Sequence, residues 1–268
     1  MSRRTELARL ARAATGGLIS VEEAAVVLAR SRPATARRLA ELTRQGWLAR
    51  VRRGLYQVMP LDAAPSRAPE MVEDAWVLAS RVFAPCYIGG WSAAEHWGLT
   101  EQIFRTTLVV SAAEVRETEQ ELGGHRYRVF RIPRAALGAG VRLVWRGAER
   151  VPVSGPERTI VDCLRNPELC GGVRHLAEIV SAYASDGNAD VDELLRVARA
   201  RANGAAWKRL GYLAEQLWPP EVAAAVIAAA RRRLSSGYVK LDPAARDQGR
   251  RSARWGLRLN VPIQADSV

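Results

Sequence analysis

The stretch that decides the fold runs from Ser20 to Val58, SVEEAAVVLARSRPATARRLAELTRQGWLARVRRGLYQV. Ser20 and Glu23 have the spacing of a capping box, which predicts a helix from Ser20 to about Ala29. Pro33 suits the first turn of the next helix, because the amide hydrogen that proline lacks would have no helical partner there. The stretch therefore predicts two short helices joined by a tight turn at residues 30–32.

A basic hairpin follows these two helices. After Gly46, residues 47–51 and 55–58 alternate as strands do, with Arg52-Arg53-Gly54 between them. Residues 3–14 place Leu7 and Leu10 on one helical face, so they predict a further helix that Gly16-Gly17 ends. Three helices and a hairpin indicate a winged helix-turn-helix domain over residues 1–60.

Positive charge is concentrated in this predicted domain. Residues 1–60 contain 12 Arg, no Lys and four Glu, a net charge of +8. The other 208 residues contain 28 basic and 24 acidic residues, a net charge of only +4. This asymmetry indicates a localised face that binds a polyanion, and phosphate neutralisation supplies much of the affinity for nucleic acids.

The helix that begins near Pro33 is the predicted recognition helix for the major groove of double-stranded DNA. We expect Ala36, Leu39, Ala40 and Thr43 to pack inward. The N-terminal part of such a helix approaches base edges, where Arg pairs bidentately with guanine. The residues expected to contact DNA are Arg32, Thr35, Arg37, Arg38 and Arg44 on the helix, and Arg50, Arg52 and Arg53 on the wing. The alternative is an ordinary solvated basic face.

The rest of the chain predicts a second domain of mixed composition. Residues 61–69 are proline-rich and predict a linker, which leaves residues 70–268 for the second domain. The expected fold class is α+β, with a mixed α/β second domain that ends largely helical. Helices are expected at 70–83, 92–97, 156–164, 173–184, 191–202, 205–217 and 221–234, and strands at 86–90, 106–110, 127–132, 141–145, 238–241 and 256–261.

Several classes of protein fit the composition poorly. Three Cys are too few for a disulfide framework, so we expect a reducing cytoplasm. No run approaches the roughly 18 apolar residues of a membrane span, and the charged N-terminus lacks the apolar core of a signal peptide. His96, His125 and His175 are scattered, and the sequence lacks both Cys-x-x-Cys and a phosphate-binding loop. We therefore expect no metal and no cofactor.

One short motif raises a hydrolase alternative. Gly90-Trp91-Ser92-Ala93-Ala94 lies between an expected strand and helix, as a nucleophile elbow would, and Asp162 and His175 follow in hydrolase order. However, Ala94 stands where an elbow has glycine, and the expected βα repeats are missing. The other interpretation, that Ser92 is the N-cap of a helix, is favoured, so we expect no enzyme.

The chain resembles the AbiEi antitoxins of type IV toxin–antitoxin, or abortive-infection, systems. The order and spacing of several motifs along nearly the whole chain carry this resemblance. They are Arg52-Arg53-Gly54-Leu55-Tyr56, residues 87–99 (YIGGWSAAEHWGL), residues 154–162 (SGPERTIVD), residues 209–213 (RLGYL), Leu241-Asp242-Pro243 and residues 255–260 (WGLRLN).

The resemblance implies a DNA-binding repressor that is also an antitoxin. Such a protein binds inverted repeats next to its own promoter, and its C-terminal domain counters a co-encoded nucleotidyltransferase toxin. Direct contact with the toxin, action on the same target and modification of the toxin all stay open. The alternative from a different class is a ligand-sensing winged-helix repressor without a toxin partner.

Two further features carry alternatives of their own. Glu157, Arg158 and Asp162 are favoured as a structural ion-pair group at a helix N-terminus over a contact with the toxin. A second basic cluster near the C-terminus is either a solvated face or a surface for DNA, tRNA or an acidic toxin. It contains Arg231, Arg232, Arg233, Arg246, Arg250, Arg251 and Arg254.

Overall fold

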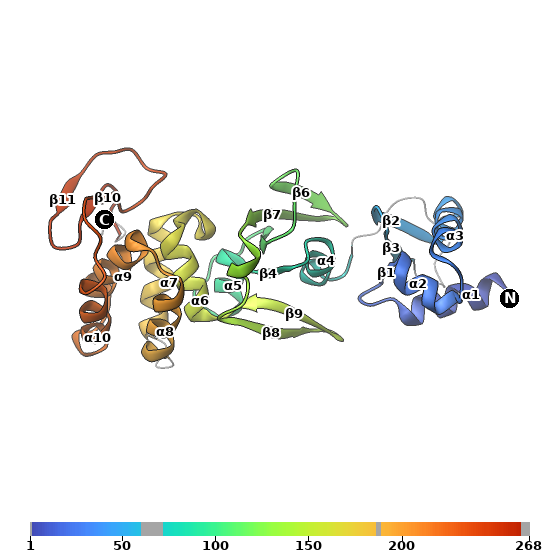
Figure 1. Ribbon diagram of the computed structural model, residues 1–268, viewed down its shortest axis with the longest axis horizontal. Helices are drawn as coiled ribbons and strands as arrows, with labels where there is room; N and C mark the ends of the chain where they lie inside the picture. The colour runs from blue at the N-terminus through green and yellow to red at the C-terminus, as the bar shows by residue number, and fades with distance from the viewer. Residues whose placement is uncertain (1, 60–71, 186–188, 264–268) are drawn as a thin grey trace.

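The computed structural model describes residues 2–59, 72–185 and 189–263. The expected linker at 61–69 lies outside these residues. Figure 1 shows an elongated molecule with the N-terminal helices at one end, a sheet in the middle, and a helical layer with small C-terminal strands at the other end. The chain is α+β, as the sequence predicts.

The N-terminal region is a winged helix-turn-helix. Its helices are α1 (Arg3–Ala13), α2 (Val21–Leu28) and α3 (Arg32–Arg44), and its strands are β1 (Leu18–Ser20), β2 (Leu48–Arg52) and β3 (Leu55–Val58), in the order β1-β3-β2. The Ser20 hydroxyl accepts from the Glu23 amide at 3.1 Å, and the Glu23 carboxylate accepts from the Ser20 amide at 2.7 Å. Leu10, Leu39 and Leu42 are fully buried between the helices. The capping box and the local hydrophobic spacing thus form the module that they predict.

A six-stranded mixed sheet forms the middle of the molecule. Its order is β6-β7-β5-β4-β9-β8, in which β5/β7 and β4/β9 are parallel pairs and the other neighbours are antiparallel. The strands are β4 (Cys86–Ile88), β5 (Thr106–Ser111), β6 (Glu119–Leu122), β7 (His125–Arg131), β8 (Val141–Arg146) and β9 (Glu149–Ser154). Strand β5 alternates between faces, so that Leu108 and Val110 enter the larger core and Val109 enters the smaller one.

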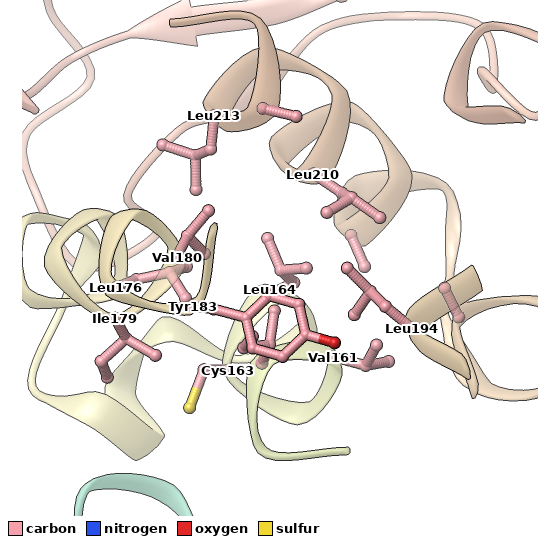
Figure 2. Close-up of a cluster of buried hydrophobic side chains, with 14 of the residues drawn as sticks. Val161, Cys163, Leu164, Leu176, Ile179, Val180, Tyr183, Leu194, Leu210 and Leu213 are labelled. Atoms are coloured by element: carbon pink, nitrogen blue, oxygen red, sulfur yellow. The ribbon is translucent and has the colours of Figure 1, made fainter. Parts of the chain in front are cut away.

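Helices cover the two faces of this sheet unequally. On one face, α4 (Ala75–Val82) packs against the sheet together with Leu18 and Leu55 of the N-terminal domain. The larger core holds α5 (Gly90–His96), α6 (Pro156–Arg165), α7 (Val173–Ser185), α8 (Val191–Arg201), α9 (Gly204–Leu217) and α10 (Pro220–Arg231), with short 3₁₀ turns at Arg134–Ala136 and Pro167–Cys170. Figure 2 shows Val161 and Leu164 of α6 among side chains from α7, α8 and α9, which makes α6 the centre of this layer.

Three short strands close the C-terminal end. They are β10 (Val239–Lys240), β11 (Arg250–Ser252) and β12 (Leu257–Leu259), in the order β10-β12-β11. Trp255 is buried against Gly211 of α9, where a Cβ atom would lie 2.1 Å from the indole ring. Glycine at 211 therefore lets this terminal segment pack directly on the backbone of α9.

Most differences from the expected elements concern short or polar strands. The structure adds β6, β9 and β11, which were not predicted: β6 (EQEL) and β11 (RRS) are polar, and β9 (ERVPVS) contains a proline. These segments become strands by pairing with β7, β8 and β12. In the described part of 70–83, the helix begins only at Ala75, since Asp74 accepts hydrogen bonds from Trp76 and Val77 as an N-cap.

Candidate nucleic-acid interface

The recognition helix α3 is held with one face inward and one face open. Its buried side chains are Thr35, Leu39 and Leu42, whereas Arg37 and Arg44 are exposed. Ala29, in the left-handed conformation at φ 52°, ends α2 and turns the chain into α3. The helix-turn-helix therefore presents arginines from the outer face of α3, as the sequence predicts for Arg37 and Arg44.

The predicted phase of α3 is wrong at two positions. Thr35, expected to face DNA, is fully buried, and Ala40, expected to pack inward, is exposed. The two leucines that fill the core, Leu39 and Leu42, set the rotation of the helix, and Thr35 lies one turn before Leu39 on the same face. Alanine packs on either side of a helix at little cost: Ala36 is half-buried against the core, as expected, whereas Ala40 is exposed.

Arg38 does not project freely toward a groove. Its guanidinium donates to both oxygens of Glu6 on α1, at 2.6–3.1 Å, and lies 2.8 Å from Glu41. Glu6 is buried, and the Arg38 side chain is only 18% exposed. Hydrogen bonds from Arg38 to Glu6, and then to Glu41, raise the pKa of Arg38 above its ordinary value. The charge expected to read bases is thus held in an ion-pair group that joins α1 to α3.

Arg32, at the start of α3, is paired in a different way. Its Nε atom lies 2.6 Å from Glu22, but the Arg32 side chain is 73% exposed. Exposed ion pairs contribute about 0–1 kcal/mol to stability, so Glu22 holds the Arg32 guanidinium only weakly. The open cations of α3 are therefore Arg32, Arg37 and Arg44.

The wing is turned toward the second domain. Arg52 donates a hydrogen bond to the Arg81 carbonyl at 3.0 Å, and burial lowers the pKa of Arg52. Leu55 packs in the smaller core with Val77 of α4. The Arg52 side chain is thus hydrogen-bonded to the second domain but stays exposed, and its contact with DNA stays a prediction.

The other two wing arginines, Arg50 and Arg53, are also exposed. Arg50, on β2, lies opposite Tyr56 of β3, next to a break in the strand register. Arg53 lines a hollow of about 580 Å³ together with Phe83 and Arg116 of the second domain. Both side chains are therefore open to solvent.

An ion pair that was not predicted from the sequence joins the two domains. Arg81 of α4 donates to the Glu23 carboxylate at 3.0 Å, across 58 residues of chain. Burial alone would raise the pKa of Glu23, but hydrogen bonds from Arg81 and Ser20 prevail and lower it. The same carboxylate thus closes the capping box of α2 and holds α4. Sequence reasoning missed Glu6 and Arg81, because their partners lie far away in the chain and no motif marks them.

The residues of the suggested hydrolase triad lie in separate networks. The Ser92 hydroxyl is buried and accepts from the Leu108 amide at 2.9 Å, and Gly89, not Ser92, occupies the N-cap position of α5. His175 contacts the Cys170 carbonyl at 2.6 Å and the Thr100 hydroxyl at 2.7 Å. Both interpretations of Ser92 are therefore wrong, since it anchors β5 and does not meet His175. In the described ranges, no group of three or more His, Cys, Asp or Glu side chains is placed to hold a metal.

Two models of known protein families match this chain. Residues 6–58 match the family described as transcriptional regulator, AbiEi antitoxin, and residues 85–216 match the AbiEi antitoxin C-terminal domain. The chain belongs to the AbiEi antitoxin family. Membership makes it an antitoxin-type transcriptional regulator with a DNA-binding domain.

A solved structure has the same overall fold as this AbiEi chain. The crystal structure of the RV2827C protein from Mycobacterium tuberculosis superposes with a TM-score of 0.60 and 21% sequence identity, over 94% of this chain and 90% of that chain. At this identity, the likeness concerns the fold. No curated protein matches the sequence. Among the described helices of the AbiEi chain, none is long and apolar enough to cross a membrane.

The SGPERTIVD motif of the AbiEi C-terminal domain is largely buried. Arg158 is fully buried and donates to Asp162 at 2.6 Å and to the Tyr87 hydroxyl at 2.8 Å. It also donates to the carbonyls of Ala136 and Ala139. These bonds connect α6, β4 and the turn before β8, which supports the structural interpretation of the motif.

The C-terminal basic cluster of the AbiEi chain lies at the opposite end from α3 (Figure 1). Arg233 stacks over Trp207 at 5.1 Å, Arg251 stacks over Tyr238 at 5.3 Å, and Arg254 lies 2.7 Å from Glu215. These three arginines have local partners. The cluster therefore does not extend the basic face of α3.

Proposed function

We propose that this protein binds the DNA upstream of its own operon in a sequence-specific manner, represses that operon, and counteracts a co-encoded nucleotidyltransferase toxin. The observation that carries the proposal is the open basic face of α3, Arg32, Arg37 and Arg44, on a winged helix joined to an AbiEi C-terminal domain. Arg37 is the proposed base-reading residue, and Arg32 and Arg44 are proposed to contact phosphates. We propose that the protein acts in the bacterial cytoplasm, and we assign no catalytic step to it.

Paired half-sites suit this design. A helix-turn-helix reads a few base pairs, so repressors of this kind bind inverted repeats as two molecules. On each half-site α3 would enter the major groove, with Arg50, Arg52 and Arg53 of the wing at the flanking phosphates. Thr35 is left out of this assignment because it is buried, and Arg38 is left out because Glu6 holds it.

A gel-shift titration tests the DNA half of the proposal. The purified protein is titrated on its own upstream fragment and on random DNA of equal length, at two salt concentrations. We expect a preference of about a thousandfold or more for the upstream fragment. Equal and strongly salt-dependent binding to both fragments would reduce the N-terminal domain to a non-specific basic surface.

The Arg37→Ala variant tests the assigned reader. We expect it to lose about 1–3 kcal/mol of binding to the upstream fragment and much less to random DNA, because only the specific complex contains the base contact. Arg174→Ala removes the same charge from the exposed side of α7 and is the matched control. Equal losses on both DNAs would reassign Arg37 to a phosphate.

Co-expression tests the antitoxin half. The neighbouring nucleotidyltransferase gene is induced in cells with and without this chain, and we expect growth to be restored only when the chain is present. Continued growth arrest in its presence would contradict toxin neutralisation and leave a repressor alone.

A further inference from the structure

A second concentration of positive charge lies near the C-terminus. Residues 231–260 contain nine basic and two acidic residues, a net charge of +7, which is close to the +8 of residues 1–60. The other 178 residues have a net charge of −3. A general preference for Arg would spread the charge along the chain, so this concentration indicates a second surface for a polyanion.

The charged segment lies along α9. Arg233 stacks over Trp207 in the first turn of this helix, and Trp255 donates to Glu215 in its last turn at 2.6 Å. The segment therefore follows α9 for about 12 Å, since a helix rises about 1.5 Å per residue. Figure 1 places it at the end of the molecule opposite to α3, so it is a surface of its own.

Most arginines of the C-terminal basic cluster have no carboxylate partner. In the part of the chain that the structure describes, only Arg254 of this cluster forms an ion pair, with Glu215 at 2.7 Å. Arg251 lies directly opposite Arg258 in the β11/β12 pair, and like charges at such positions are destabilising. Asp247, 2.9 Å from Arg258, offsets one of these two charges. The members without a carboxylate partner, all of them exposed, are Arg231, Arg232, Arg233, Arg246, Arg250 and Arg251.

An exposed aromatic ring lies among these cations. Tyr238 is 48% exposed, and the Arg251 guanidinium lies over its ring at 5.3 Å. Neighbouring residues of a strand face opposite sides, so Arg250 belongs to the other face of β11, where it lines a hollow of about 620 Å³ with Tyr212. Single strands of nucleic acid bind to surfaces of this composition, on which phosphates meet cations and bases stack on aromatic rings and guanidinium groups.

Other polyanions suit this surface less well. The bases of a duplex stack on one another, so the Tyr238 ring would find no base to cover. The cores of protein–protein interfaces are depleted of charged residues, whereas the arginines without a carboxylate partner dominate this surface. A single strand uses both the ring and the charges.

We propose that the C-terminal basic cluster binds single-stranded nucleic acid. Arg250 and Arg251 would contact phosphates, and a base would stack on the exposed ring of Tyr238. RNA and DNA strands share this chemistry, and the test compares the two. This activity is separate from operator binding by α3 and goes beyond the proposed function.

The first test removes charge from the edge strand β11. Labelled oligouridine RNA and oligothymidine DNA of about twelve nucleotides are titrated with the whole chain at several salt concentrations, and binding is followed by fluorescence anisotropy. We expect Arg250→Ala/Arg251→Ala to reduce the salt slope by about 1.4, because each phosphate contact on a single strand contributes about 0.7. The control Arg131→Ala/Arg134→Ala removes two exposed arginines elsewhere in the second domain and should bind as the wild type does.

The second test removes the aromatic ring. We expect Tyr238→Ala to weaken binding of the strand by about tenfold, as the loss of one stacked base does. Tyr238→Phe keeps the ring and should keep the affinity. Both variants should bind the upstream fragment as the wild type does in a gel shift, so a failure of operator binding by the wild type is seen separately.

Four results would overturn the proposal. A wild-type protein that binds neither strand has no such surface. An unchanged salt slope in Arg250→Ala/Arg251→Ala, with a clear loss in Arg37→Ala, would place the strand on α3. Wild-type affinity in Tyr238→Ala would remove the stacked base. An equal effect of Arg250→Ala/Arg251→Ala on a duplex of the same length would leave a general basic surface.

Discussion

At the scale of single residues, burial decides what an arginine of α3 does. Arg32 and Arg38 each approach a glutamate to 2.6 Å, but the partner of Arg38 is the buried Glu6, and the partner of Arg32 is the exposed Glu22. We expect Glu6→Ala to destabilise the protein by about 1–3 kcal/mol, because a partly buried guanidinium loses charged hydrogen bonds. Urea unfolding monitored by circular dichroism measures this loss.

The matched control at this scale is Glu22→Ala. It breaks the exposed pair with Arg32, and we expect a change within about 0.5 kcal/mol. A loss as large as that of Glu6→Ala would show that burial does not separate the two pairs, and Arg32 would leave the list of open cations.

At the scale of elements, the packing of the C-terminal strands on α9 depends on Gly211. Alanine has the better helix propensity, by about 1 kcal/mol. Its Cβ, however, would lie 2.1–2.8 Å from three atoms of the buried Trp255 ring, which also donates to Glu215. Overpacking of this kind costs about 1–3 kcal/mol or more. Gly211→Ala should therefore lower the thermal unfolding midpoint.

Gly138→Ala is the comparison for this element. Nothing lies within 4 Å of a Cβ at Gly138, and its backbone is not left-handed. Calorimetry should show an unchanged midpoint. A Gly211→Ala protein as stable as Gly138→Ala would mean that the terminal strands do not rest on α9 as described.

At the scale of the whole molecule, the Glu23–Arg81 pair couples the DNA-binding domain to the antitoxin domain. We expect Arg81→Ala to free the wing turn, so that the amides of residues 52–55 exchange faster with solvent. Arg146→Ala removes an ion pair within the second domain, to Asp74, and should leave this turn unchanged. Unchanged exchange in Arg81→Ala would contradict the coupling.

The coupling also has a defined dependence on pH. The pKa of Glu23 is lowered in the folded protein, so the contribution of the pair is complete above the ordinary glutamate range and is lost as the pH falls through the lowered value. The difference in exchange between wild type and Arg81→Ala should therefore persist from pH 7 to about pH 5 and disappear only in stronger acid. A difference that vanished near neutral pH would assign the effect to another group.

The sequence by itself determined the features that depend on neighbours in the chain. The capping box at Ser20 and Glu23, the proline at the start of α3, and the hairpin around Gly54 act over a few residues, so their geometry can be read from spacing. The helices from α6 to α10 follow from hydrophobic period for the same reason. The polar strand β6 and the proline-containing strand β9 were not predicted, because their pairing with β7 and β8 makes them strands.

The tertiary structure alone decided which predicted site residues are free. Thr35 is buried on the same face of α3 as Leu39, whereas Arg37 is exposed. Arg38 donates to Glu6, and Arg52 donates to the Arg81 carbonyl. The sequence marks all of these residues as polar and near the recognition helix. Arg38 and Arg52 bond to Glu6 and to the Arg81 carbonyl, 32 and 29 residues away along the chain, and no local period carries that information. Neighbouring residues in the sequence determined the helices and the hairpin. The packing of α1 on α3, and of α4 on the wing, determined which arginines are held by protein groups.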